Sequence, residues 1–174
     1  MADLLSIIKK EYSAYCSTLK ETSFDKENNL FLCKDTTQIV YDFDAIVKAL
    51  YPKKQPSSYD ALLINNQKVF CIEFKNQKPS KIDNKEIEEK LSNAQDILKS
   101  IFQSHNIPIK NYQFIFIVAY KNTHSQWRRG IEKAAIQFNL EQYKGQFFND
   151  IFTNDIDFFT NEYKKYFQKQ LICT

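Results

Sequence analysis

The chain has 174 residues, of which 43% are hydrophobic and 15% aromatic, enough for one packed domain spanning residues 1–174. Its two glycines, Gly130 and Gly145, cannot form a Walker or dinucleotide-binding loop, which excludes those classes of nucleotide-binding protein. The net charge of +3 is compatible with a nucleic-acid partner and equally with an ordinary soluble protein.

The four cysteines, at positions 16, 33, 71 and 173, contain no C-x-x-C pair, and the two histidines do not complete a zinc-binding pattern. We therefore expect a reducing, intracellular compartment, either cytoplasm or nucleus. The N-terminal segment MADLLSIIKKEYS lacks the basic and apolar regions of a classical secretion signal. No apolar window is long enough to predict a membrane span, so we expect no membrane partner.

The first third of the chain predicts two helices and a short strand. Apolar residues recur every three to four positions over residues 3–20, which predicts an N-terminal helix. The segment NLFLC, residues 29–33, is compatible with a short strand. Residues 42–50, DFDAIVKAL, predict a short helix with Asp42 or Asp44 as its N-cap.

A strand hairpin is predicted next, after the loop YPKKQPSS. The apolar runs Tyr59–Ile64 and Val69–Lys75 flank the polar segment Asn65–Lys68, a pattern typical of a β-hairpin. Asp83 followed by Glu86 then resembles a capping box, which predicts a helix that runs to about residue 104.

The last third predicts a central strand and further helices. Tyr112–Tyr120, YQFIFIVAY, is almost wholly apolar and indicates a strand covered on both faces. A helix is expected over residues 125–140, and residues 142–152 are irregular or an edge strand. Asp155–Leu171 predicts a closing helix whose aromatic stripe could complete the core or support a homodimer.

The order of these elements predicts an α/β fold. Strands with helices before and after them favour a small mixed β-sheet flanked by helices, with extra helices at the N- and C-termini.

Three charged residues stand at the open end of the predicted hairpin. With an even turn, position 64 pairs with 69, and Asp60 becomes the direct neighbour of Glu73, with Cβ atoms roughly 4.5–5.5 Å apart. Side chains alternate along a strand, so Glu73 and Lys75 share a face and Phe74 points to the other. Two partly buried carboxylates side by side destabilise each other, and a divalent cation would offset this effect better than Lys75 alone.

A solvated edge strand is the alternative explanation for Glu73 and Lys75, since E-x-K is common on exposed strands. The runs ALLI and VFCI, however, are apolar at every position, which indicates interior strands. Charges confined to one end of such strands are typical of a site at the rim of a buried sheet.

Asp60, the twelve residues after it and Glu73-Phe74-Lys75 resemble the motif of the PD-(D/E)XK nuclease superfamily. The order of elements over roughly residues 42–120 is similar to its restriction-endonuclease-like fold. The proline of the motif is replaced by Tyr59. The acidic residue that the preceding helix supplies in this family is not evident, and its candidates are, in order, Asp44, Asp42 and Glu11.

The resemblance implies a site for Mg²⁺ or Mn²⁺. Asp60, Glu73 and the main-chain carbonyl of Phe74 would bind the ion, with Asp44 as a further candidate ligand, and Lys75 would orient the attacking water. The implied activity is metal-dependent hydrolysis of phosphodiester bonds in DNA or RNA. The alternative is a catalytically inactive module of the same fold that binds nucleic acid or a protein partner.

Basic side chains near the hairpin and in a later segment could contact phosphates at the rim of the site. The candidates are Lys53, Lys54, Lys78, Lys81, Arg128 and Arg129. Each of them is at least as readily explained as a solvated surface charge. The resemblance implies nucleic acid, DNA or RNA, as the partner, and a homodimer or a larger complex stays open.

Overall fold

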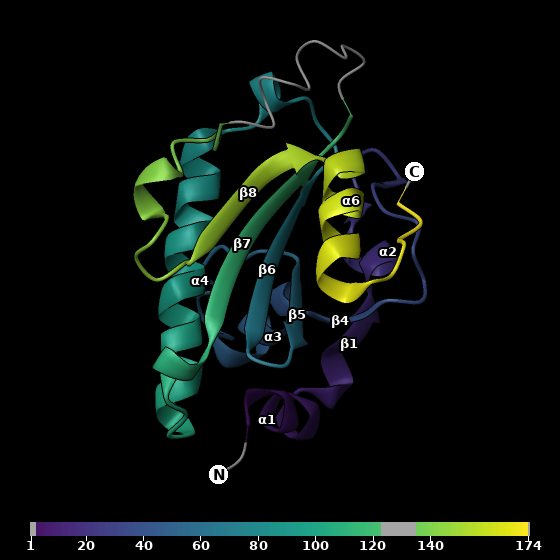
Figure 1. The fold of residues 1–174 in the computed structure, drawn as a ribbon. Helices are drawn as coiled ribbons and strands as arrows, with labels where there is room; N and C mark the ends of the chain where they lie inside the picture. The colour runs from purple at the N-terminus through teal and green to yellow at the C-terminus, as the bar shows by residue number, and fades with distance from the viewer. Residues whose placement is uncertain (1–2, 123–134, 174) are drawn as a thin grey trace.

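A computed structural model describes residues 3–122 and 135–173 and shows a six-stranded mixed sheet with helices on both faces (Figure 1). This confirms the predicted α/β class. In sheet order, the strands are β1 (Cys16–Thr18), β4 (Ile39–Asp42), β5 (Ala61–Asn65), β6 (Lys68–Lys75), β7 (Gln113–Tyr120) and β8 (Asp150–Asp155). The α-helices are α1 (Leu4–Glu11), α2 (Leu19–Thr22), α3 (Phe43–Leu50), α4 (Asn84–Ser104) and α6 (Ile156–Phe167).

Strands β5 and β6 form the predicted hairpin, closed by a two-residue turn at Asn66 and Gln67. Asn66 has a φ of 53°, in the left-handed region that asparagine tolerates better than most residues. The ladder pairs Ile64 with Val69 and Leu62 with Cys71. The register expected for an even turn is therefore confirmed over β5.

Helix α4 connects β6 to β7, which pair in parallel, and β8 adds to β7 in parallel as well. The helix begins where the sequence predicts, because Asp83 accepts a hydrogen bond of 2.9 Å from the Lys85 N–H. Its predicted apolar stripe is buried throughout. Strand β7 lies between β6 and β8 and is almost wholly buried, as expected of a central strand.

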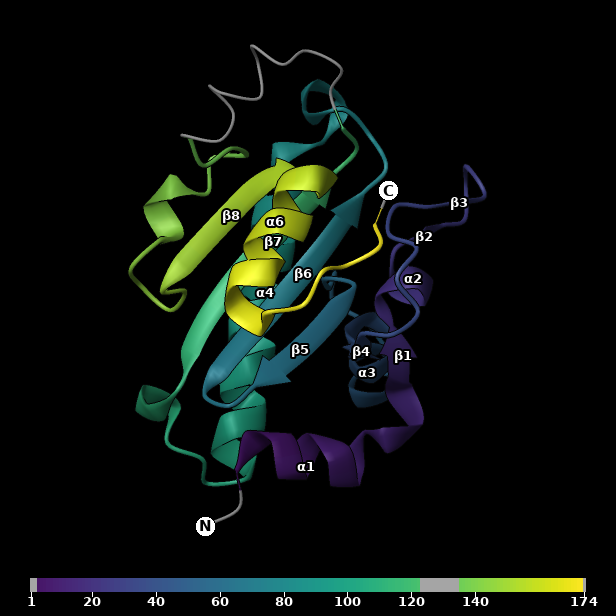
Figure 2. The same ribbon diagram turned by 45° about the vertical axis from the view of Figure 1, so that its right-hand side comes forward.

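The two faces of the sheet carry separate cores, and β6 contributes to both of them. Val69 and Cys71 face the core formed with α1, α3 and α4, whereas Phe70, Ile72 and Phe74 face the core formed with α6. Figures 1 and 2 show α4 and α6 on opposite sides of the sheet. The aromatic stripe of α6 contributes to closing this second core.

The N-terminal helix is shorter than predicted. It ends at Glu11, and Cys16–Thr18 pairs as strand β1 with β4, an element that the sequence did not predict. Residues 12–18, YSAYCST, are mostly weak helix formers, and the edge of β4 offers them backbone partners. The predicted strand at residues 29–33 is confirmed only as β3 (Leu30–Phe31), which pairs with β2 (Phe24–Asp25) in a separate two-stranded sheet.

Two predictions for the last third need correction. The helix expected over residues 125–140 lies largely outside the described residues, and its described part, 135–140, is not helical because Phe138 and Asn139 have positive φ. Residues 150–155 form the edge strand β8, one of the two alternatives for this region. Helix α6 ends at Phe167 rather than at residue 171, since Gln168 adopts a left-handed conformation.

The C-terminal tail is attached to the segment that follows β3. A disulfide joins Cys33 to Cys173, the Lys34 N–H donates to the Ile172 carbonyl, and the Ile172 N–H donates to Asp35. Disulfides are more typical of oxidising compartments, so this pair does not support the reducing, intracellular compartment expected from the cysteines, which stays a prediction. None of the helices within residues 3–122 and 135–173 is long and apolar enough to cross a bilayer.

Candidate active site

The structure brings Asp60, Glu73, Phe74 and Lys75 together around a cavity of about 400 Å³. The cavity lies where β6 ends, between the first turns of α4 and the segment that includes β2. Figure 2 shows β2 and β3 beside this end of β6. Its other lining residues are Thr22, Ser23, Phe24, Asp25, Lys26, Glu27, Asn76, Gln77, Glu86 and Lys90.

Glu73 is the most deeply buried charged group of the site, with 1% of its side chain exposed. Its Oε1 lies 2.7 Å from the Lys90 Nζ and 3.3 Å from the Lys75 Nζ. Its Oε2 is also buried but accepts no hydrogen bond from the residues that the structure describes. A buried carboxylate oxygen without a partner is energetically unfavourable, so this atom has unused capacity for a cation or a donor.

Asp60 reaches the site in a way that the sequence did not predict. The β5–β6 ladder ends at Ala61 and Ile72, so Asp60 and Glu73 are not a cross-strand pair. Asp60 instead places its Oδ2 2.7 Å from the Phe74 main-chain N–H, so its side chain acts as the hydrogen-bond partner beyond the end of the ladder. Its own N–H donates to the Ile72 carbonyl, which keeps this residue against β6.

The Phe74 carbonyl, proposed from the resemblance as a metal ligand, points toward Asp60. In a strand the N–H and C=O of one residue lie on the same side, and the Phe74 N–H is bonded to Asp60. The Phe74 side chain points into the core beneath α6, as predicted from the alternation along β6.

The two carboxylates perturb each other. Burial raises the pKa of Asp60 well above its usual value, and the nearby charge of Glu73 raises it further. Burial also raises the pKa of Glu73, although Lys90 and Lys75 partly oppose this effect. Burial alone would lower the pKa of Lys90, but the carboxylates of Glu73 and Asp60 outweigh burial and raise it. The two carboxylates therefore favour the charged form of Lys90.

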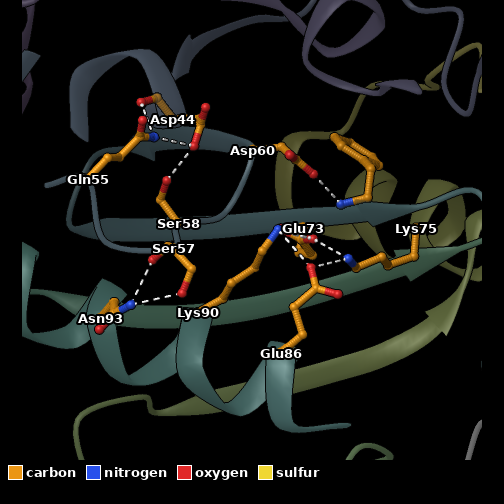
Figure 3. Close-up of polar contacts among 11 residues, drawn as sticks. Asp44, Gln55, Ser57, Ser58, Asp60, Glu73, Lys75, Glu86, Lys90 and Asn93 are labelled. Carbon is orange, nitrogen blue, oxygen red and sulfur yellow. Dashed lines mark hydrogen bonds and ion pairs between the residues drawn. The ribbon is translucent and has the colours of Figure 1, made fainter. Parts of the chain in front are cut away.

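One face of α4 holds the other parts of the site in place (Figure 3). Glu86 accepts a hydrogen bond of 2.6 Å from Lys75, and Lys90 donates to Glu73. Asn93 donates two bonds of 2.9 Å to Ser57, in the loop that leads to Asp60. These three helix residues are one turn apart, so their side chains leave the same face of the helix.

Sequence reasoning missed Lys90 and assigned Glu86 another role. Glu86 was expected to complete a capping box, but its carboxylate contacts Lys75 and Lys90 instead. The sequence does contain a signal for these two residues, because Glu86 immediately precedes Ile87 and Lys90 immediately precedes Leu91, and both apolar residues belong to the buried stripe. The periodicity places both residues at the border of the buried face of the helix, but it does not say what this border contacts.

The candidates for the upstream acidic residue lie elsewhere. Asp44 is exposed on α3, accepts hydrogen bonds from Ser58 and Gln55, and is not among the lining residues of the cavity (Figure 3). Asp42 is the N-cap of α3, and Glu11 contacts His105. The acidic residues that do line the cavity besides the predicted pair are Asp25, Glu27 and Glu86.

The candidate phosphate contacts are placed only in part. Lys53 and Lys54 are exposed in the loop before Ser57, and Lys78 and Lys81 are exposed just beyond the cavity-lining segment that ends at Gln77. Arg128 and Arg129 lie outside the described residues.

The donor set fits a divalent cation such as Mg²⁺, which proteins often hold through one or two carboxylates while it keeps several waters. Asp60, the unpartnered Oε2 of Glu73 and the Phe74 carbonyl are oxygen donors of that kind. Within the described part of the chain, no group of three or more His, Cys, Asp or Glu side chains is arranged so that it could hold a metal ion by itself. Any cation here would therefore depend on water and on substrate oxygens for its remaining ligands.

Comparisons with protein-family models, with curated proteins and with solved structures found no match to this chain. The resemblance to PD-(D/E)XK nucleases therefore stays a prediction from the motif residues of the sequence.

Proposed function

We propose that this protein is a Mg²⁺- or Mn²⁺-dependent nuclease of the PD-(D/E)XK type, which hydrolyses phosphodiester bonds in DNA or RNA. The observation that carries the proposal is the buried, unpartnered Oε2 of Glu73, in a cavity that Asp60 and Lys75 also line. A buried carboxylate oxygen without a hydrogen-bond partner calls for an explanation, and perturbed carboxyl pKa values cluster at functional sites.

Each residue has a distinct role in this proposal. Asp60 and Glu73 would hold the cation, together with the Phe74 carbonyl. The bound cation would lower the pKa of a coordinated water and stabilise negative charge on the phosphate. Lys75 would orient the attacking water, and Glu86 would position Lys75 through their 2.6 Å hydrogen bond.

The test is cleavage of mixed DNA and RNA substrates in Mg²⁺ or Mn²⁺, with and without EDTA. Glu73→Ala and Lys75→Ala should each abolish cleavage. Glu89→Ala and Lys48→Ala are matched controls, since both residues are exposed and neither lines the cavity, and they should cleave normally. Cleavage that persists in EDTA or in Glu73→Ala would rule out the proposed centre.

A second candidate is an inactive module of the same fold that binds nucleic acid or a protein. The observation that favours it is that two lysines already lie beside the Glu73 carboxylate, so the site carries its own positive charges. Under this alternative, the protein cleaves no substrate and binds no Mn²⁺. Nucleic-acid binding that persists in EDTA and weakens with salt would then show that the partner of the inactive module is nucleic acid and not a protein.

A further inference from the structure

Lys90 lies where its positive charge acts on the carboxylates of both Glu73 and Asp60. Its Nζ is 2.7 Å from the Glu73 Oε1, and its side chain is only 15% exposed. The ammonium also acts electrostatically on Asp60. Lys90 therefore supplies the positive charge that a carboxylate pair in a cavity requires.

A divalent cation and the Lys90 ammonium would compete for the same group. The Oε1 of Glu73 already has two ammonium groups within 3.3 Å, from Lys90 and Lys75. A third positive centre in this cavity would be repelled strongly, because charges a few ångströms apart interact by several kcal/mol at the effective dielectric of a protein surface. One of the lysines must therefore move when a cation binds.

The geometry indicates which lysine moves. Lys75 is held by Glu86 at 2.6 Å and contacts Glu73 only at 3.3 Å. Lys90 has its short contact with Glu73, and its second carboxylate, Glu86, is 3.5 Å away on the same helix face. A small change of its flexible side chain would transfer the Lys90 ammonium from Glu73 to Glu86.

We propose that Lys90 is the resident counter-ion of the site and controls its affinity for divalent cations: it neutralises Glu73 in the cation-free protein and shifts to Glu86 when a cation binds. This inference rests on the proposed function, since only a cation-binding site requires the exchange. Lys90 is thus a positioning residue that limits cation affinity. Removal of Lys90 should therefore raise the affinity for divalent cations, whereas removal of a residue that only orients Glu73 should lower it.

The test is Mn²⁺ binding without nucleic acid, followed by the electron paramagnetic resonance signal of free Mn²⁺. Lys90→Gln should bind Mn²⁺ roughly tenfold more tightly than the wild type, because the competing charge is gone. Lys85→Gln is the matched control, since it removes an exposed charge from the same helix outside the cavity lining, and its affinity should change little. Circular dichroism checks that each variant is folded.

A second variant tests the destination of the ammonium. Glu86→Gln should weaken Mn²⁺ binding several-fold, because Lys90 then has no second carboxylate to receive it. If Lys90→Gln does not fold, this variant decides: an unchanged or tighter affinity for Mn²⁺ would overturn the proposal.

The outcomes separate the inference from the function on which it rests. Measurable binding by the wild type, with equal or weaker binding by Lys90→Gln, would refute the role of Lys90 and leave the nuclease proposal intact. Mn²⁺ binding by Lys90→Gln but not by the wild type would be the strongest support for competition between Lys90 and the cation. No binding by either protein would overturn the metal-dependent function as well.

Discussion

The carboxylate of Asp60 accepts a hydrogen bond of 2.7 Å from the main-chain N–H of Phe74, just beyond the last pair of the β5–β6 ladder. A side chain thereby satisfies the backbone group that the neighbouring strand no longer reaches. The same bond fixes one oxygen of Asp60 against β6 and directs its carboxylate toward the cavity. The same hydrogen bond therefore ends the β5–β6 pairing and positions a carboxylate that lines the cavity.

Asp60→Asn should stabilise the cation-free protein near neutral pH by about 1 kcal/mol, or roughly 2–4 °C in Tm. The amide oxygen can still accept from the Phe74 N–H, while the partly buried negative charge near Glu73 is removed. Because the pKa of Asp60 is raised on folding, the wild type loses stability as pH rises above the unfolded-state pKa of about 3.9.

The advantage of Asp60→Asn should therefore grow as pH rises above about 4 and vanish below about pH 3, where Asp60 is protonated in both states. Thermal unfolding of the wild type and Asp60→Asn in EDTA at several pH values measures this difference in stability. A variant less stable than the wild type at pH 7 would contradict the burial argument.

Asn93→Ala should destabilise the protein by about 1 kcal/mol, because it removes both hydrogen bonds that hold Ser57 against α4. The loop that carries Lys53 and Lys54 should become more sensitive to limited proteolysis. Asp96→Ala is the control, since Asp96 is exposed on the same helix. Equal proteolysis of the two variants would show that the anchor does not restrain the loop.

The double variant Lys78→Gln/Lys81→Gln should weaken nucleic-acid binding and reduce the slope of log K against log salt by roughly 1.5–2. Both lysines are exposed beside the cavity. Lys9→Gln/Lys10→Gln changes the same charge on α1, which lies by the turn at the opposite end of the hairpin (Figure 1). If both pairs change the slope equally, binding does not involve a rim at the site.

Reduction of the Cys33–Cys173 disulfide should lower the free energy of unfolding by about 2–4 kcal/mol, because it releases the C-terminal tail from the segment after β3. The denatured, unreduced protein should show two reactive thiols, from Cys16 and Cys71, and four after reduction. Cys16→Ser should leave stability unchanged. Four thiols without reductant would show that the pair does not form in solution.

The central elements could be predicted from the sequence because their signals are local. The turn at Asn66 fixed the register of β5 and β6, and the apolar stripe together with the Asp83 cap fixed α4. The predicted placement of Glu73 and Lys75 on one face of β6 followed from alternation alone and agrees with their shared contacts on the α4 side.

What could not be predicted depends on contacts between distant segments. Strand β1 forms because β4 offers an edge, and nothing within residues 16–18 indicates this partner. The departure of Asp60 from the ladder depends on hydrogen bonds to both neighbouring segments, including one from Phe43 to its carbonyl. The role of Lys90 requires knowing which turn of α4 lies over the end of β6.

The contacts among Asp60, Glu73, Lys75, Glu86 and Lys90 have a consequence for folding. The hydrogen bonds that assemble this cluster join residues only 11 to 17 positions apart, whereas Ile172 meets Asp35 across 137 positions. Short loops close with little loss of chain entropy, so contacts of low sequence separation tend to form early. We expect this cluster to belong to the folding nucleus, with the terminal segments docking onto it afterwards.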